Sequence, residues 1–295
     1  MPRETPRPPT SLRHTFAMSP TPPSLRQIPD ATTLDEVIDT IASIIDWSIS
    51  VSSRLGYFAA LYKRITIAVR QAIRDGAFDD GPRMERFDVA FANRYFDALN
   101  GYFHSGDFGK PTRSWQVTFD GASRPEPIIV QHMIAGVTTH IELDLGIVVP
   151  QITSGAQLST LRNDFNTINA VLASQLNGIV ASVGDLSPAL ADLYAVLADN
   201  EIFLINEAVR SMRDSAWRFA TLLTLEPGFA RPPTIWARDR QVAGQVEVTF
   251  DPPGLTGLIR TVIAAIAARE SRDIVKNIQV LDAIASTPAP IQTTL

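Results

Sequence analysis

The spacing of apolar residues is the feature that most limits how this 295-residue chain can fold. From Leu34 onward, apolar side chains recur every three or four residues over most of the chain, which is the period of an amphipathic α-helix. Segments with a strand-like pattern are few and short. We therefore predict an all-α protein that forms a single-domain helical bundle.

Capping residues, glycines and prolines predict where the helices begin and end. Thr33 and Glu36 form a capping box at the start of a first helix, which should run to about Ser50. The helix predicted at 53–75 has one apolar stripe without a charge in it, so we interpret it as a packing helix. Further helices are predicted at about 82–100, 128–148, 158–183, 188–224, with a break near Ala198, and 255–285.

Parts of the chain fall outside this helical pattern. Residues 1–30 contain eight of the 21 prolines, a density that excludes a helix, and we predict a disordered tail there. The helical domain is then expected at 31–285, followed by a flexible C-terminus at 286–295. Residues 115–119 and 246–250 have a strand-like pattern and overlap the similar fragments QVTFDG and EVTFDP, so they could pair as a small two-stranded β-ribbon. The long connection at 101–127 and the segment 226–295 receive no functional role.

Composition limits the classes of partner. The net charge of −5 does not favour a surface that binds phosphates, so no nucleic-acid partner is expected. The chain has no cysteine, which excludes disulfides and a thiolate nucleophile. Its longest apolar stretch, 255–268, contains Arg260 and is too short to span a membrane. We expect a cytoplasmic protein without a membrane partner, and make no prediction of its oligomeric state.

Ionisable residues on apolar helix faces are the most informative local feature. In the helix predicted at 128–148, His140 and Asp144 lie one turn apart, about 6 Å along the axis, within a wide apolar face. Asp88 and Glu201 lie on the apolar stripes of two other helices. Burying a charged group costs several kcal/mol unless the group is paired or binds a metal. We therefore expect these four side chains to meet in one pocket.

Each of these residues also has a structural interpretation. His140 and Asp144 could form a local ion pair. Asp88 could bind Arg94 or a neighbouring tyrosine, and Glu201 could stabilise the start of its helix. We favour a functional site because ionisable groups with perturbed pKa values cluster at such sites.

The expected function is that of an enzyme acting on a small, largely apolar molecule. Asp144 would orient His140, which would act as general base or acid, and Asp88 and Glu201 would supply the second acid or base. Isomerisation or cyclisation fits these groups. So does metal-assisted hydrolysis, if a divalent ion bound to His140 and Asp144 is the cofactor. Residues predicted to contact the substrate are His132, Asn169, Tyr95 and Arg94.

Two other classes of function remain open at this point. The protein could bind an apolar small molecule without turning it over, the polar cluster fixing the orientation of the ligand. It could also be a structural or interaction module whose buried ions only enforce one packing arrangement. No cofactor at all is compatible with each of these readings.

Several short blocks of sequence form a recognisable combination. They are 53–62 (SRLGYFAALY), 81–88 (GPRMERFD), 92–95 (ANRY), 131–132, His140 with 143–146 (LDLG), 164–165 with 168–169, and Arg213 with 216–217. Over about residues 33–223 the chain resembles the family called domain of unknown function 5995. The resemblance implies a helical fold and no particular chemistry, and it does not include the first 30 residues or those after about Glu226.

Overall fold

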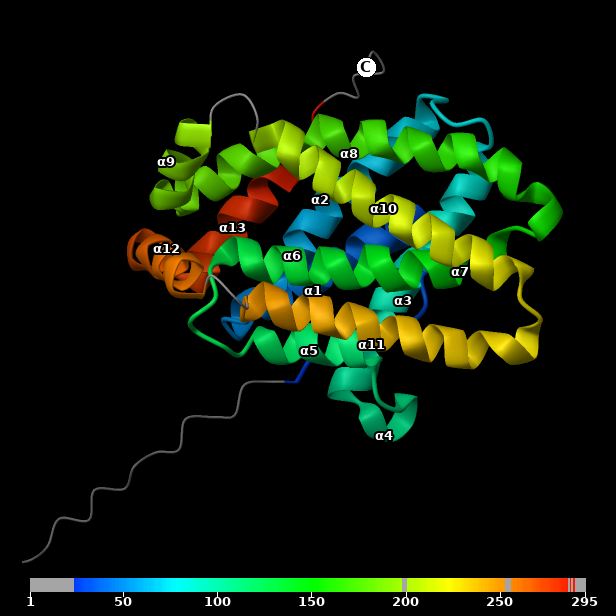
Figure 1. Cartoon of the computed structure of the whole chain (residues 1–295), viewed down its shortest axis with the longest axis horizontal. Helices are drawn as coiled ribbons and strands as arrows, with labels where there is room; N and C mark the ends of the chain where they lie inside the picture. Colours follow the sequence, from blue (N-terminus) through cyan, green and yellow to red (C-terminus); the bar gives the residue numbers. More distant parts are fainter. Residues whose placement is uncertain (1–23, 198–200, 253–255, 286, 288, 290–295) are drawn as a thin grey trace, which may run out of the picture.

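The computed structural model describes residues 24–197, 201–252, 256–285, 287 and 289. These residues form helices and no strand, which confirms the all-α prediction for the part of the chain described (Figure 1). The α-helices are α1 (Leu34–Ser50), α2 (Leu55–Arg74), α3 (Gly81–Phe103), α4 (Ser105–Phe108), α5 (Arg113–Gly121), α6 (Ile129–Thr139), α7 (Leu145–Ile152), α8 (Leu158–Leu186), α9 (Pro188–Leu197), α10 (Glu201–Leu225), α11 (Arg231–Phe250), α12 (Thr256–Arg269) and α13 (Ile274–Ala285). A π-helical turn, His140–Asp144, joins α6 to α7.

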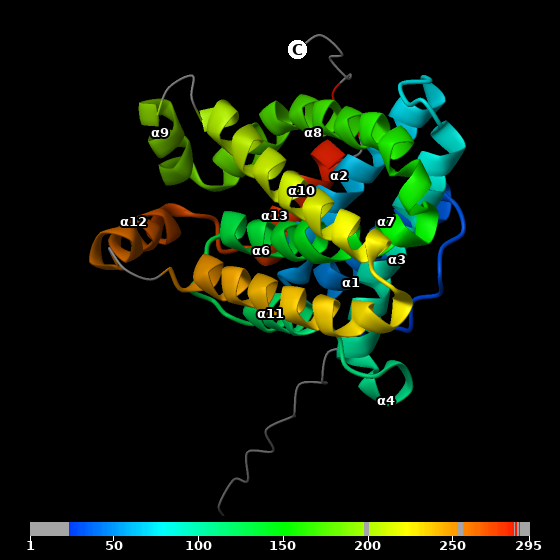
Figure 2. The same ribbon diagram turned by 45° about the vertical axis from the view of Figure 1, so that its right-hand side comes forward.

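The helix formed by α6, the π-turn and α7 occupies the centre of the molecule. In Figure 2, α8 and α10 lie on one side of it and α11 lies on the other. Among the described residues, Ile129–Ile152 is also the one helix long and apolar enough to cross a membrane by length and composition. Its most apolar window is 72% buried inside the protein, which is typical of a core helix.

Local capping explains where the first and third helices begin. The Thr33 hydroxyl accepts the backbone N–H of Glu36, as the capping box predicts. The Glu36 carboxylate accepts both the backbone N–H and the hydroxyl of Thr32, one residue earlier than expected. At α3, the Asp80 side chain accepts the N–H of Arg83. These bonds satisfy amides that have no partner within the helix.

The predicted β-ribbon is wrong. Residues 115–119 lie in α5 and residues 246–250 lie in α11, and these two helices pack side by side. Asp239 of α11 accepts the first two backbone amides of α5, from Arg113 and Ser114, and so caps that helix from outside. Trp115 and Phe119 are then buried together on one helical face. A tertiary cap and a four-residue aromatic spacing therefore outweigh the strand preference of the short segment.

The N-terminal boundary of the folded region lies earlier than predicted. Leu25 and Ile28 are buried in the main core, although the prediction placed residues 1–30 in a disordered tail. The Asn100 side chain accepts the N–H of Ile28 at 2.9 Å and donates to its carbonyl oxygen at 2.8 Å. The side-chain amide of Asn100 thus replaces the backbone partners that an extended segment otherwise lacks. Residues 1–23 lie outside the described part.

The C-terminal third also differs from the prediction. The segment expected to connect residues 224 and 255 contains α11, and the single helix expected at 255–285 is two helices, α12 and α13. Of the predicted flexible C-terminus, residues 287 and 289 are described, and Gln175 bonds to the backbone of Ala289. The break predicted at Ala198 falls outside the described residues.

Candidate functional site

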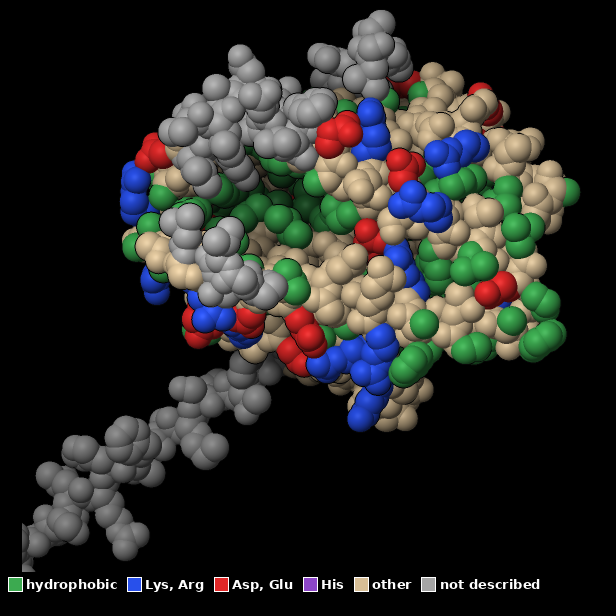
Figure 3. All heavy atoms as spheres, viewed as in Figure 1, with side chains coloured by type: hydrophobic (Ala, Val, Ile, Leu, Met, Phe, Trp, Pro, Cys, Tyr) green, Lys and Arg blue, Asp and Glu red, His purple; other side chains and the backbone are tan. Residues whose placement is uncertain are grey.

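A cavity of about 310 Å³ lies among α2, α3, α6, α8 and α10. Its wall is mainly aliphatic and aromatic, and Figure 3 shows a hollow lined by hydrophobic side chains on the face that carries these helices. Helix α2, interpreted from its sequence as a plain packing helix, supplies part of the wall through Phe58, Tyr62 and Val69. The polar residues of the wall are Tyr62, Asp88, His140, Asn206 and Arg213.

His140 and Asp144 form a hydrogen-bonded pair in the π-turn. His140 Nδ1 lies 3.0 Å from Asp144 Oδ2, and both side chains are buried. Asp144 also accepts the indole N–H of Trp115 at 2.8 Å and Nε–H of Arg94 at 3.3 Å. Because a carboxylate only accepts, the proton of this pair is on Nδ1, which leaves the lone pair of the imidazole on Nε2.

The His140 ring faces the cavity among aromatic side chains. It stacks on Phe91 with ring centroids 3.6 Å apart, and Tyr62 meets it edge to face at 4.8 Å. Burial lowers the pKa of His140 below 6.5, and Asp144 offsets part of that effect. The imidazole is therefore neutral at pH 7. Its Nε2 has no hydrogen-bond partner among the described residues.

Asp88 lines the same cavity and has no partner for its charge. Its side chain is buried, Oδ2 has no hydrogen-bond partner, and no ion pair with a described residue reaches it. Burial raises the pKa of Asp88 to about 7. Near neutral pH this carboxyl group can therefore either give or take a proton. Arg94, the partner considered from the sequence, binds Asp144 instead.

Two residues predicted to contact a substrate lie behind the His140–Asp144 pair. Arg94 is bonded to Asp144 and does not line the cavity. Tyr95 is buried and packs against Phe58 and Trp115, with ring centroids 5.1 and 5.2 Å apart. Their positions suit them to hold the pair in place, and the prediction that they contact a ligand stays a prediction, since neither residue lines the cavity.

The remaining predicted residues divide into three cases. His132 does not line the cavity: its ring packs between Tyr57 and Phe250, and burial lowers its pKa to about 3, as for a neutral core histidine. Asn169 accepts a hydrogen bond from Arg213, a residue of the wall, at 2.6 Å. Glu201 is the first residue of α10, and its side chain lies outside the described part.

Arg213 is the polar wall residue that the search for buried acids and histidines missed. It lies next to Met212 on α10, within the apolar stripe that the sequence places on that helix. Its guanidinium donates to Asn169 and to the backbone oxygen of Phe165, and stacks over the Phe165 ring. The signal in the sequence is an arginine beside an apolar stripe, and the side chain is 4% exposed in the structure.

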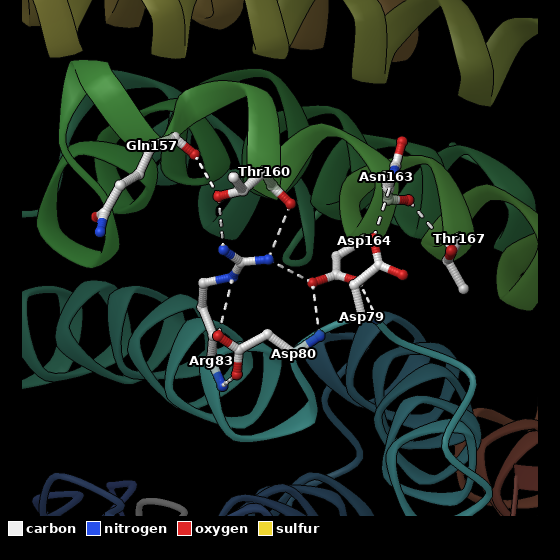
Figure 4. Close-up of polar contacts among 8 residues, drawn as sticks. All are labelled: Asp79, Asp80, Arg83, Gln157, Thr160, Asn163, Asp164 and Thr167. Carbon is white, nitrogen blue, oxygen red and sulfur yellow. Dashed lines mark hydrogen bonds and ion pairs between the residues drawn. The ribbon is translucent and has the colours of Figure 1, made fainter.

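A third buried aspartate has a structural role. Asp164 of α8 accepts the backbone amides of Asp79 and Asp80 and a bond from Arg83 Nη2 at 2.7 Å (Figure 4). Arg83 also donates to the hydroxyl and carbonyl oxygens of Thr160. Two of the sequence blocks named above, 81–88 and 164–165, therefore meet here and fasten α8 to the start of α3.

The acidic and histidine side chains are not grouped as a metal site. The described residues contain no cluster of three or more His, Asp or Glu side chains that could hold an ion. His140 Nδ1 and Asp144 Oδ2 bond to each other, so these two atoms do not face a common ion as the sequence-based metal hypothesis requires.

The fold and the cavity define a class: an all-α protein with an apolar cavity whose wall contains the histidine of a buried His–Asp pair. The chain belongs to the family of unknown function DUF5995, whose family model matches residues 34–252. This confirms the resemblance seen in the sequence and extends it through α11. No curated protein and no solved structure matches the chain.

Proposed function

We propose that the protein is an acid–base enzyme that moves a proton on a small, largely apolar molecule held in the cavity. One observation carries the proposal: the wall of a single apolar cavity contains three buried titratable groups, His140, Asp88 and Tyr62, each with an atom that lacks a hydrogen-bond partner among the described residues. Buried polar groups in proteins are normally bonded, and exceptions often mark catalytic groups.

Two of these groups, His140 and Asp88, have complementary protonation states. His140 Nε2, neutral and carrying a lone pair, is the base, and Asp144 holds the ring and stabilises the imidazolium that forms. Asp88, with a pKa of about 7, is the acid in its protonated form. In an isomerisation, His140 removes a proton from one atom of the substrate and Asp88 delivers one to another. Return of a proton from His140 to Asp88 then restores the starting state.

The apolar wall supports such chemistry physically. Exclusion of water from a cavity strengthens each electrostatic interaction inside it. The same wall would also suit a protein that binds an apolar ligand without turning it over. The experiment must therefore distinguish an enzyme from a binding protein.

The test is exchange of deuterium, because it does not require the net reaction to be known. The protein is incubated in D₂O with small ketones, enones and carboxylic acids that have removable C–H protons, and label is measured by mass spectrometry. We expect His140→Gln and Asp88→Asn to lower the exchange rate by roughly 10²- to 10⁴-fold, the usual contribution of a general acid or base.

His132→Gln is the matched control, since His132 is a buried histidine of the same central helix outside the cavity wall. It should exchange at the wild-type rate. Wild-type exchange in the folded His140→Gln variant would contradict the proposal. A compound that binds and never exchanges label would identify a binding protein.

A further inference from the structure

Arg213 is a charged residue of the cavity wall that has no role in the proposed proton transfer. It projects from α10 and is 4% exposed, yet no carboxylate of the described residues lies within 4.0 Å of it. Arg64 is equally buried and also has no carboxylate of the described residues within 4.0 Å, but it donates to the carbonyl oxygen of Ile284 and does not line the cavity, whereas Arg238 pairs with Glu142. Arg213 instead bonds to two neutral oxygens, one of Asn169 and one of Phe165.

The guanidinium of Arg213 keeps donors available. Arginine has five N–H donors, and its bonds to Asn169 and Phe165 use Nε and Nη2, while Nη1 bonds to no described residue. Burial lowers the pKa of Arg213 to about 9, so the group stays protonated at neutral pH. A buried cation without an anion is unfavourable, and an anionic ligand in the cavity would remove that cost.

We propose that the ligand of this cavity is a small apolar carboxylic acid whose carboxylate pairs with Arg213. The claim that such an acid is the substrate rests on the proposed function. The claim that such an acid binds at Arg213 does not depend on it. Asn169 and the Phe165 ring fix the plane of the guanidinium, as a fork-like bond to a carboxylate requires.

Charge and size narrow the class further. A single arginine balances one negative charge, whereas a phosphate monoester brings nearly two, and among the described residues no second Lys or Arg lines the wall to balance the other. A lone apolar cavity of roughly 150 Å³ takes up benzene. The present cavity, at about 310 Å³, has about twice that volume. A monocarboxylate with an alkyl chain or one aromatic ring fits both limits.

The inference also orients the ligand. Arg213 lies on α10, while His140 lies in the π-turn and Asp88 lies on α3. With its carboxylate held at Arg213, a ligand would extend its apolar part over residues such as Val209 and Ile141 toward the two proton-transfer groups. The reacting atom would then be a carbon away from the carboxylate itself.

The experiment compares acids with their neutral amides by isothermal titration calorimetry at pH 7.5. The probes are straight-chain and phenyl-substituted carboxylic acids of six to twelve carbons, each with its primary amide. In the wild type we expect the best acid to bind at least tenfold more tightly than its amide. Arg213→Met should remove that preference and change binding of the amide less than threefold.

Arg162→Met is the matched control, because Arg162 also packs over an aromatic ring at the α8–α10 contact but is half-exposed and outside the wall. It should keep the preference for the acid. Equal binding of acids and amides across the series in the wild type would overturn the inference, and that comparison needs no variant. If Arg213→Met does not fold, Arg213→Lys replaces it and should retain part of the preference.

The same probes separate this inference from the proposed function. An acid that binds through Arg213 but shows no deuterium exchange would leave the anion site standing and would refute the enzyme. Exchange on neutral compounds, with no preference for acids, would leave the enzyme standing and would refute the anion site.

Discussion

The raised pKa of Asp88 predicts that removing this charge makes the protein more stable and that the gain grows with pH. Raising the pKa from 3.8 to about 7 means that the folded state binds the proton more tightly than the unfolded state. Stability is then lost as pH rises through this window. At ~1.4 kcal/mol per pKa unit, the full cost above pH 7 is about 4 kcal/mol.

Asp88→Asn keeps the shape of the side chain and removes the titration. Between pH 5 and pH 8 the cost to the wild type rises from roughly 2 to roughly 4 kcal/mol by the same linkage relation. The variant should therefore gain roughly 2–3 kcal/mol more at pH 8 than at pH 5. His140 and Tyr62, the titratable neighbours in the wall, are present in both proteins, so their direct contributions cancel in the difference.

Urea unfolding followed by circular dichroism at both pH values measures this difference. Asp46→Asn, at an exposed position of α1, is the control and should change the unfolding free energy by less than ~0.5 kcal/mol at either pH. A gain for Asp88→Asn that is the same at pH 5 and pH 8 would show that Asp88 is not a buried carboxyl of raised pKa. The reasoning about the acid of the site would then fail with it.

Three further predictions concern packing and buried bonds. Gly146→Ala should destabilise the protein by about 1–3 kcal/mol in thermal unfolding, because the new Cβ would lie 2.2 Å from a ring atom of Phe219. Gly244→Ala, in an open part of α11, is the matched control and should stabilise the protein by ~0.5–1 kcal/mol. Trp115→Phe removes a donor from Asp144 and should cost about 1–3 kcal/mol, measured by urea unfolding. Asn100→Ala should speed proteolysis within residues 24–33, as fragment mapping by mass spectrometry would detect.

Local features of the sequence predicted the local features of the structure. The Thr33 cap and the pairing of His140 with Asp144 depend on spacings of three and four residues along one helix. The π-turn that contains the pair was not predicted, since no residue type in it differs from those of an ordinary helix. Its effect is confined to one turn, so the pair still forms.

Positions that depend on packing between helices were harder to predict. The central helix is apolar around most of its circumference, so its pattern cannot tell which neighbour each face meets. His132 and His140 lie eight residues apart, roughly 80° around the axis at 100° per residue, and consequently face different neighbours. Likewise Asp239 lies 125 residues from Ser114, whose helix it caps, and no local pattern connects them.

The partners of the buried charges provide the strongest argument that the cavity is functional. Asp144, Asp164 and Asp239 look like Asp88 on a helical wheel, yet each of the three accepts three hydrogen bonds within the protein. Asp88 accepts none from the described residues, and Arg213 has no acid beside it. Both of these line the cavity. A charge without a partner is costly to bury, and a ligand that uses an acid and a cation is the explanation that we propose for these two side chains.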